Sequence, residues 1–111
     1  MAKQTLRSRI EDEFGKRGLD IHIVSASVNE AVFGNEIVEF TYIAMKIRAV
    51  TDRGTLLLSL STGDGDFHDA DEVVRKCFSG NLFKPKVSTL KGLSAVLKSD
   101  YNRVYNYMAR W

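Results

Sequence analysis

Three runs of residues with strong β preference follow one another through the first half of the chain, separated only by short turn signals. The runs cover 20–29, 36–50 and 55–61, and β-branched residues are frequent in them. Gly34-Asn35 and Thr51-Asp52-Arg53-Gly54 lie between them. Connections this short cannot make the crossover that parallel strands need, so the pattern predicts a three-stranded antiparallel meander.

Apolar residues at helical spacing flank these runs on both sides. A first helix is predicted at about 3–16, where every fourth residue is apolar and Gly18 follows as a left-handed cap. Asp69 and Glu72 have the spacing of a capping box, which predicts a short second helix ending at Gly80. Both helices are amphipathic, so each needs a sheet or another helix to cover its apolar side.

Ser88 follows the loop that contains Pro85 and is predicted to cap a third helix over 88–111, which continues through Leu93 and Leu97. The order is therefore α-β-β-β-α-α, which predicts an α+β fold with the helices on one face of the sheet. The chain of 111 residues is 44% apolar and 27% charged, proportions typical of one compact domain over 1–111.

No apolar run approaches the roughly 20 residues of a membrane span, and the charged start lacks a signal-peptide pattern. Cys77 is the only cysteine and cannot form an internal disulfide. These features predict a cytoplasmic protein, whether of a host or of a virus-infected cell. Walker, dinucleotide, nucleophile-elbow and CxxC motifs are missing from the sequence, so we expect a non-enzymatic protein without a cofactor.

Positive charge is concentrated in the last third of the chain. Residues 75–111 hold eight basic side chains and one acidic, whereas residues 1–74 hold eight basic and thirteen acidic. Such a split favours one face that meets an anionic partner. The candidate contacts with a single-stranded nucleic acid are Lys84, Lys86, Lys91, Lys98, Arg103 and Arg110, with Tyr42 and Phe83 as residues that stack on bases. Without base-reading motifs, recognition is expected to tolerate many sequences.

Two families share part of this order of elements. The chain resembles the double-stranded-RNA-binding domain around Gly63-Asp64-Gly65, but acidic residues such as Asp66 follow where that family has lysines, so duplex RNA is not expected. Over about 14–101 it is similar in topology to single-strand-annealing recombination proteins. That resemblance is carried by Phe40-Thr41-Tyr42, Asp52-Arg53-Gly54 and Leu90-Lys91-Gly92-Leu93, and it implies single strands rather than duplexes.

The end of the third helix has an apolar arc of about 200°, wider than packing on one sheet requires. Its last turn either packs against its own chain or forms an interface. Aromatic and methionine side chains are typical of contact centres, so helix 88–111 is expected to contribute to a homo-oligomer. The interface candidates are Tyr101, Tyr105, Tyr107, Met108 and Trp111. The alternative function is a small phage-like adaptor or inhibitor that binds a protein through them.

Acidic residues gather just before the second helix. Asp64, Asp66 and His68 are the candidate metal ligands, and metal-dependent phosphodiester cleavage is the catalytic alternative. Their spacing does not fit an EF-hand loop, and the acids that follow are suited to the start of a helix. We therefore expect no metal site and no catalytic residues here.

Overall fold

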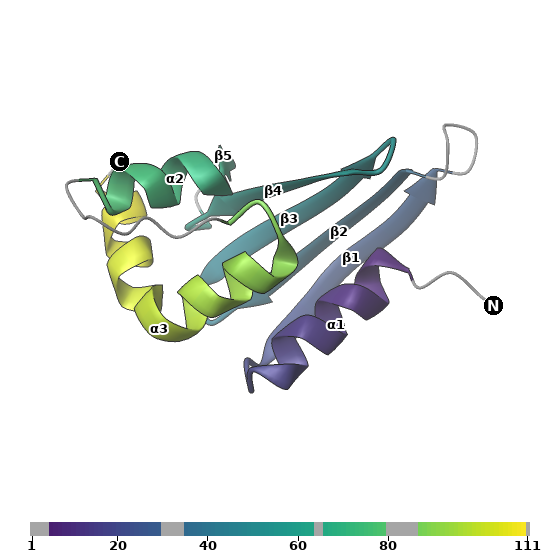
Figure 1. Ribbon diagram of the computed structural model, residues 1–111, viewed down its shortest axis with the longest axis horizontal. Coiled ribbons are helices and arrows are strands. Elements are labelled where there is room, and N and C mark those ends of the chain that lie inside the picture. Colours follow the sequence, from purple (N-terminus) through teal and green to yellow (C-terminus); the bar gives the residue numbers. More distant parts are fainter. Residues whose placement is uncertain (1–4, 30–34, 64–65, 80–86, 111) are drawn as a thin grey trace.

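The computed structural model describes residues 5–29, 35–63, 66–79 and 87–110. In chain order they form α1 (Leu6–Lys16), β1 (Ile21–Asn29), β2 (Asn35–Tyr42), β3 (Met45–Asp52), β4 (Thr55–Ser61), β5 (His68–Asp69), α2 (Ala70–Cys77) and α3 (Leu90–Ala109). The strands make one antiparallel sheet in the order β1-β2-β3-β4-β5, as each strand pairs with the next along the chain. The fold is α+β, as predicted (Figure 1).

The prediction of three strands was wrong, because the sheet formed by the described residues has five. The run 36–50 is a hairpin in which β2 and β3 are joined by Ile43 and Ala44. Ile43 has φ 57°, a left-handed conformation that β-branched residues rarely adopt, so the sequence carries no recognisable turn signal there. The fifth strand has only two residues, and His68 in it pairs with Leu60 of β4.

The helix ends follow the capping rules in most places. Thr5 caps α1 by accepting a hydrogen bond from the Ser8 N–H at 3.1 Å, and Gly18 has the left-handed φ of 73° that was expected. Asp69 caps α2 as predicted. The third helix was expected to start with a Ser88 cap, but Thr89 takes that position and accepts from the Gly92 N–H at 3.0 Å.

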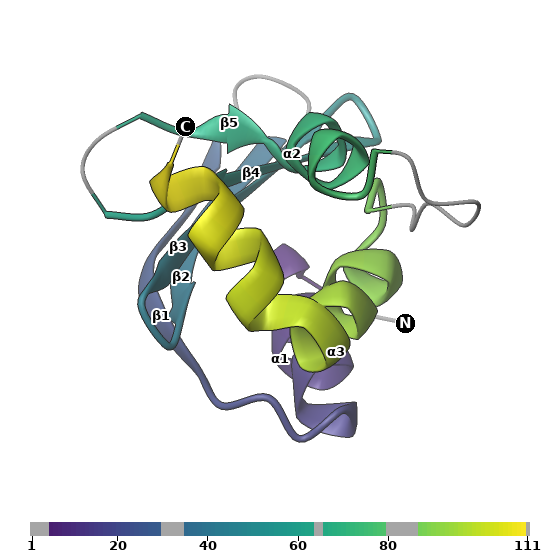
Figure 2. The same cartoon turned by 90° about the vertical axis from the view of Figure 1, so that its left-hand side faces the viewer.

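The helices lie on one side of the sheet, which gives the expected two layers (Figure 2). Phe14 of α1 meets Phe40 of β2 edge to face, with ring centres 5.2 Å apart, a geometry worth about 1 kcal/mol beyond simple burial. The sheet residues buried beneath the helices are Val38, Phe40, Met45, Ile47, Ala49, Leu58 and Leu60. No helix among the described residues is both long and apolar enough to cross a membrane.

Candidate nucleic-acid interface

Helix α3, together with Arg110 at its C-cap, carries four of the predicted phosphate contacts, and it is bent near its middle. Asp100 has φ −136° and ψ 29°, outside the helical range, so the helix consists of two segments (Figure 1). Leu93 and Leu97 bury the first segment against the core, and Val104 buries the second. The exposed sides of the two segments therefore belong to one helix but follow different directions.

The bend has an identifiable cause in the residues beside it. The Ser99 hydroxyl lies 3.1 Å from the Ala95 carbonyl oxygen and 2.7 Å from Asp100 Oδ2, and either oxygen can accept its proton. A serine that donates to the carbonyl four residues earlier competes with the helical ladder and often bends the helix. When the Ser99 proton points to Asp100 Oδ2 instead, it gives the one acidic group of α3 a donor.

Lys91 and Lys98 lie in the first segment, and both are exposed. They are seven residues apart, nearly two helical turns, so they project in similar directions. Among the residues that the structure describes, neither lysine forms an ion pair. Lys91 borders a shallow cavity of about 310 Å³ between α1 and α3, where Asp12 and Glu13 also lie. The field around Lys91 is therefore mixed in sign.

Arg103 and Arg110 lie beyond the bend and are exposed as well. The Arg103 guanidinium carbon lies 4.1 Å from the centre of the Phe78 ring, so this side chain stacks on the end of α2. Stacking holds the guanidinium group in place while its N–H groups remain able to bind an anion. Arg110 caps the C-terminus of α3 through its backbone.

The predicted base-stacking residues receive less support. Tyr42 is half-buried and meets the Tyr101 ring edge to face at 5.3 Å, so it is part of the packing between β2 and α3. Phe83, Lys84 and Lys86 lie outside the described residues. The structure thus places four of the predicted cations on one helix and Tyr42 in an intramolecular contact.

The predicted interface residues of α3 mostly pack against their own chain. Met108 is 5% exposed and Tyr105 stacks on Tyr101 at 5.7 Å. The Tyr101 hydroxyl accepts a hydrogen bond from the Ala44 N–H at 3.0 Å, and burial raises the pKa of this phenol above its ordinary value. Tyr107 is half-buried, and Trp111 lies outside the described residues. The described part of the wide apolar arc is therefore largely covered within one molecule.

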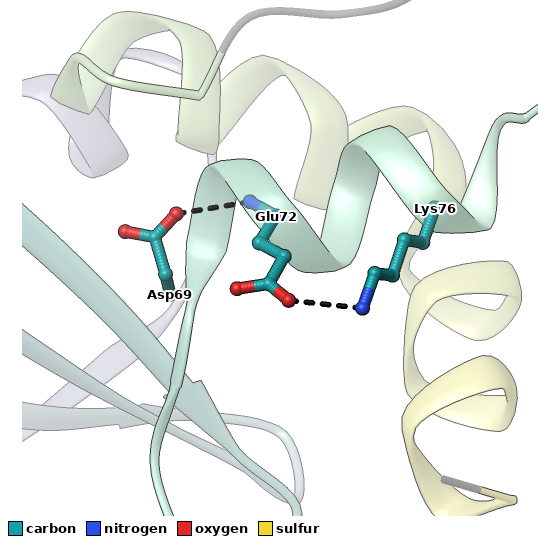
Figure 3. A network of polar contacts seen from close by, with 3 residues as sticks. All are labelled: Asp69, Glu72 and Lys76. Carbon is teal, nitrogen blue, oxygen red and sulfur yellow. Dashed lines mark hydrogen bonds and ion pairs between the residues drawn. The ribbon is translucent and has the colours of Figure 1, made fainter.

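The acidic residues before α2 stabilise the start of that helix. Asp69 Oδ2 accepts from the Glu72 N–H at 3.0 Å, and the Glu72 carboxylate contacts Lys76 Nζ at 2.9 Å (Figure 3). This lysine contact is the main cause that lowers the pKa of Glu72. Asp69 thus makes the contact expected of it in a capping box, whereas the Glu72 side chain pairs with Lys76 one turn further along the helix.

The candidate metal ligands do not form a group in the described residues. Asp66 is exposed and His68 is half-buried in β5, while Asp64 lies outside the described residues. Within the described ranges, no three His, Cys, Asp or Glu side chains converge to hold an ion.

The apolar row on the uncovered face of the sheet was not anticipated from the sequence. Ile37 and Leu57 are 44% and 49% exposed, and both pair with Val50, which makes an apolar row across β2, β3 and β4. Beside it, Arg48 contacts Glu39 at 2.8 Å and lies over the Phe67 ring. The alternation of residues between the two faces of each strand is the signal that could have shown this row. Because the turn at Ile43 was not recognised, the residues that share a face could not be assigned.

Comparisons with protein-family models, with curated proteins and with solved structures gave no match to this chain.

Proposed function

We propose that this protein is a non-enzymatic binding module that holds single-stranded nucleic acid through the exposed cations of α3, without reading its sequence. The observation that carries this proposal is the row of exposed basic residues on that helix, Lys91, Lys98, Arg103 and Arg110. The one acid of α3, Asp100, is half-buried and accepts a hydrogen bond from Ser99. Lysine and arginine on a solvated face attract phosphates over a distance set by the salt concentration.

The bend in α3 favours single strands over duplexes. Because it lies between the two pairs of cations, the phosphates that contact both pairs must follow a turned path. A single strand bends at little cost, whereas bending a short duplex costs several kcal/mol. The resemblance to single-strand-annealing recombination proteins points the same way, although the comparisons gave no match.

Fluorescence anisotropy with a labelled single strand and its matched duplex tests this proposal. The wild-type protein is compared with a variant that combines Lys91→Gln and Lys98→Gln, and with Lys46→Gln as a control. Lys46 is equally a surface lysine but lies on the uncovered face of the sheet, opposite Thr41. We expect tighter binding of the single strand, weaker binding by the double variant and unchanged binding by the control.

Equal losses in the control and the double variant would contradict a specific role for α3. A protein that binds neither nucleic acid at low salt would leave the adaptor or inhibitor function as the remaining candidate. That function would then use the half-buried Tyr105 and Tyr107, since Met108 is inside the core.

A further inference from the structure

Strand β1 forms one edge of the sheet, and its outer side is open. It pairs only with β2, and among the described residues no segment pairs with its other edge (Figure 1). Outward-facing N–H and C=O groups along an edge strand are a ready template for another strand. At nine residues β1 is also long for an edge strand, while β5 at the opposite edge has two.

The edge lacks the charges and prolines that usually prevent such pairing. Residues 21–29 contain no Lys, Arg, Asp, Glu or Pro. Val24 and Val28 are 58% and 53% exposed. One irregularity is present, a bulge at Val24 where the register with β2 shifts between Ile23 and Ser25. The regular part of the open edge is therefore Ser25–Asn29.

The same part of the edge is left uncovered by α1. Ile21 and Ile23 are partly buried against the core, whereas Ala26 and Val28 are exposed on the helix side of the sheet, where they pair with Val38 and Glu36. A small cavity of about 190 Å³ lies there, between the start of α1 and these strands. A strand added at this edge would place its side chains beside that cavity.

The sequence of the edge favours a second copy of this chain as the added strand. Residues 24–28 read Val-Ser-Ala-Ser-Val, which is the same in both directions. When two copies of this strand pair antiparallel about Ala26, Ala26 of one copy lies opposite Ala26 of the other. Each Ser25 then lies opposite Ser27 of the other copy, and each Val28 lies opposite the bulged Val24. Ser25 and Ser27 are both on the uncovered face of the sheet, where they pair with Glu39 and Ile37. Serine pairs and aliphatic pairs both support cross-strand contacts.

We propose that two copies of this chain pair through β1, antiparallel and two-fold symmetric about Ala26, so that their sheets join edge to edge. Such an interface is isologous and closes on itself, which agrees with a discrete dimer. About five residues of each strand take part, so the buried area is small and the dimer dissociates on dilution. The pairing needs neither nucleic acid nor the cations of α3.

A cysteine cross-link tests the register directly. With Cys77→Ala as background, Ala26→Cys places two thiols opposite each other across the two-fold axis. Opposed residues of antiparallel strands have Cα atoms about 4.5–5.5 Å apart, within the range of a disulfide. Mild oxidation without nucleic acid should give a covalent dimer on a non-reducing gel. Leu57→Cys in the same background, on the uncovered face, should stay monomeric.

Sedimentation velocity of the wild-type chain over a hundredfold concentration range gives the second readout. We expect a monomer–dimer equilibrium that Ser27→Lys abolishes, because a charged lysine on an open edge strand opposes pairing with another strand. Ser27 is exposed, so this change leaves the core undisturbed. Leu57→Lys should leave it intact. A wild-type chain that is monomeric throughout would overturn the proposal, as would a dimer lost with Leu57→Lys and retained with Ser27→Lys. Circular dichroism checks folding, and the Ala26→Cys cross-link remains decisive if Ser27→Lys unfolds.

Discussion

Replacing Met108 by alanine tests whether the end of α3 belongs to the core of its own chain. Met108 is 5% exposed and lies one turn beyond Val104, which is fully buried. Truncation of a buried methionine to alanine costs about 2–5 kcal/mol, because it removes apolar contacts and leaves a cavity. For a domain of this size, 1 kcal/mol corresponds to about 4 °C in Tm. We therefore expect Met108→Ala to lower Tm by roughly 8–20 °C.

Urea and thermal unfolding followed by circular dichroism measure this loss. Asn106→Ala is the matched control, because Asn106 is on the same helix but exposed, and its free energy of unfolding should change by about 0.5 kcal/mol or less. If the two variants unfolded at the same urea concentration, the packing of the last two turns would be refuted, and the apolar arc would again be available for a partner. Truncation after Arg103 is expected to unfold the domain for the same reason, because it removes Val104 and Met108 from the core.

Two further predictions concern α2 and its C-terminal end. Asp69→Ala should cost about 1 kcal/mol in urea unfolding because it removes the cap from the Glu72 N–H, and exposed Asp66→Ala should cost much less; equal losses would mean that the cap contributes nothing. Burial raises the pKa of the Cys77 thiol, so alkylation near pH 8 should be slower in the native protein than in urea. Between the two pKa values the folded thiol stays protonated while the unfolded thiol ionises. Its contribution to stability is therefore present below the ordinary thiol pKa and lost as pH rises through the pKa of the folded protein. Equal alkylation rates in the native and the urea-unfolded protein would contradict the raised pKa.

The elements with strong local signals were predicted from the sequence almost to the residue. Strand β4 has the predicted bounds Thr55–Ser61, and Gly18 and Asp69 end and begin their helices as expected. These positions depend on local rules, such as a glycine that takes positive φ or an acid that accepts from helix N–H groups.

The sequence did not reveal two local features that have no distinctive residue signal. The hairpin at Ile43-Ala44 has no glycine or asparagine, so the run of β-forming residues appeared continuous. The bend at Asp100 depends on a serine hydroxyl that the helical pattern does not distinguish from any other exposed polar group.

In the candidate site, the exposed lysines could be predicted from the sequence, whereas the contact between the two tyrosines could not. Exposure of Lys91 and Lys98 follows from helical periodicity, which a sequence shows directly. By contrast, Tyr101 and Tyr42 were assigned to different surfaces, yet they pack on each other across the sheet and α3. Contacts between residues so far apart in sequence become visible only when the layers are assembled.

The salt dependence of single-strand binding tests the proposed function most directly. If the four exposed cations of α3 each contact one phosphate, the slope of log K against log salt should be about −3, since each contact to a single strand contributes about −0.7. Affinity would then fall roughly 50-fold between about 50 and 200 mM salt. The variant with Lys91→Gln and Lys98→Gln should have about half that slope, with a fall of roughly sevenfold. The same slope in the wild type and the double variant, or no binding at the lowest salt, would contradict the proposal that the cations of α3 bind single strands.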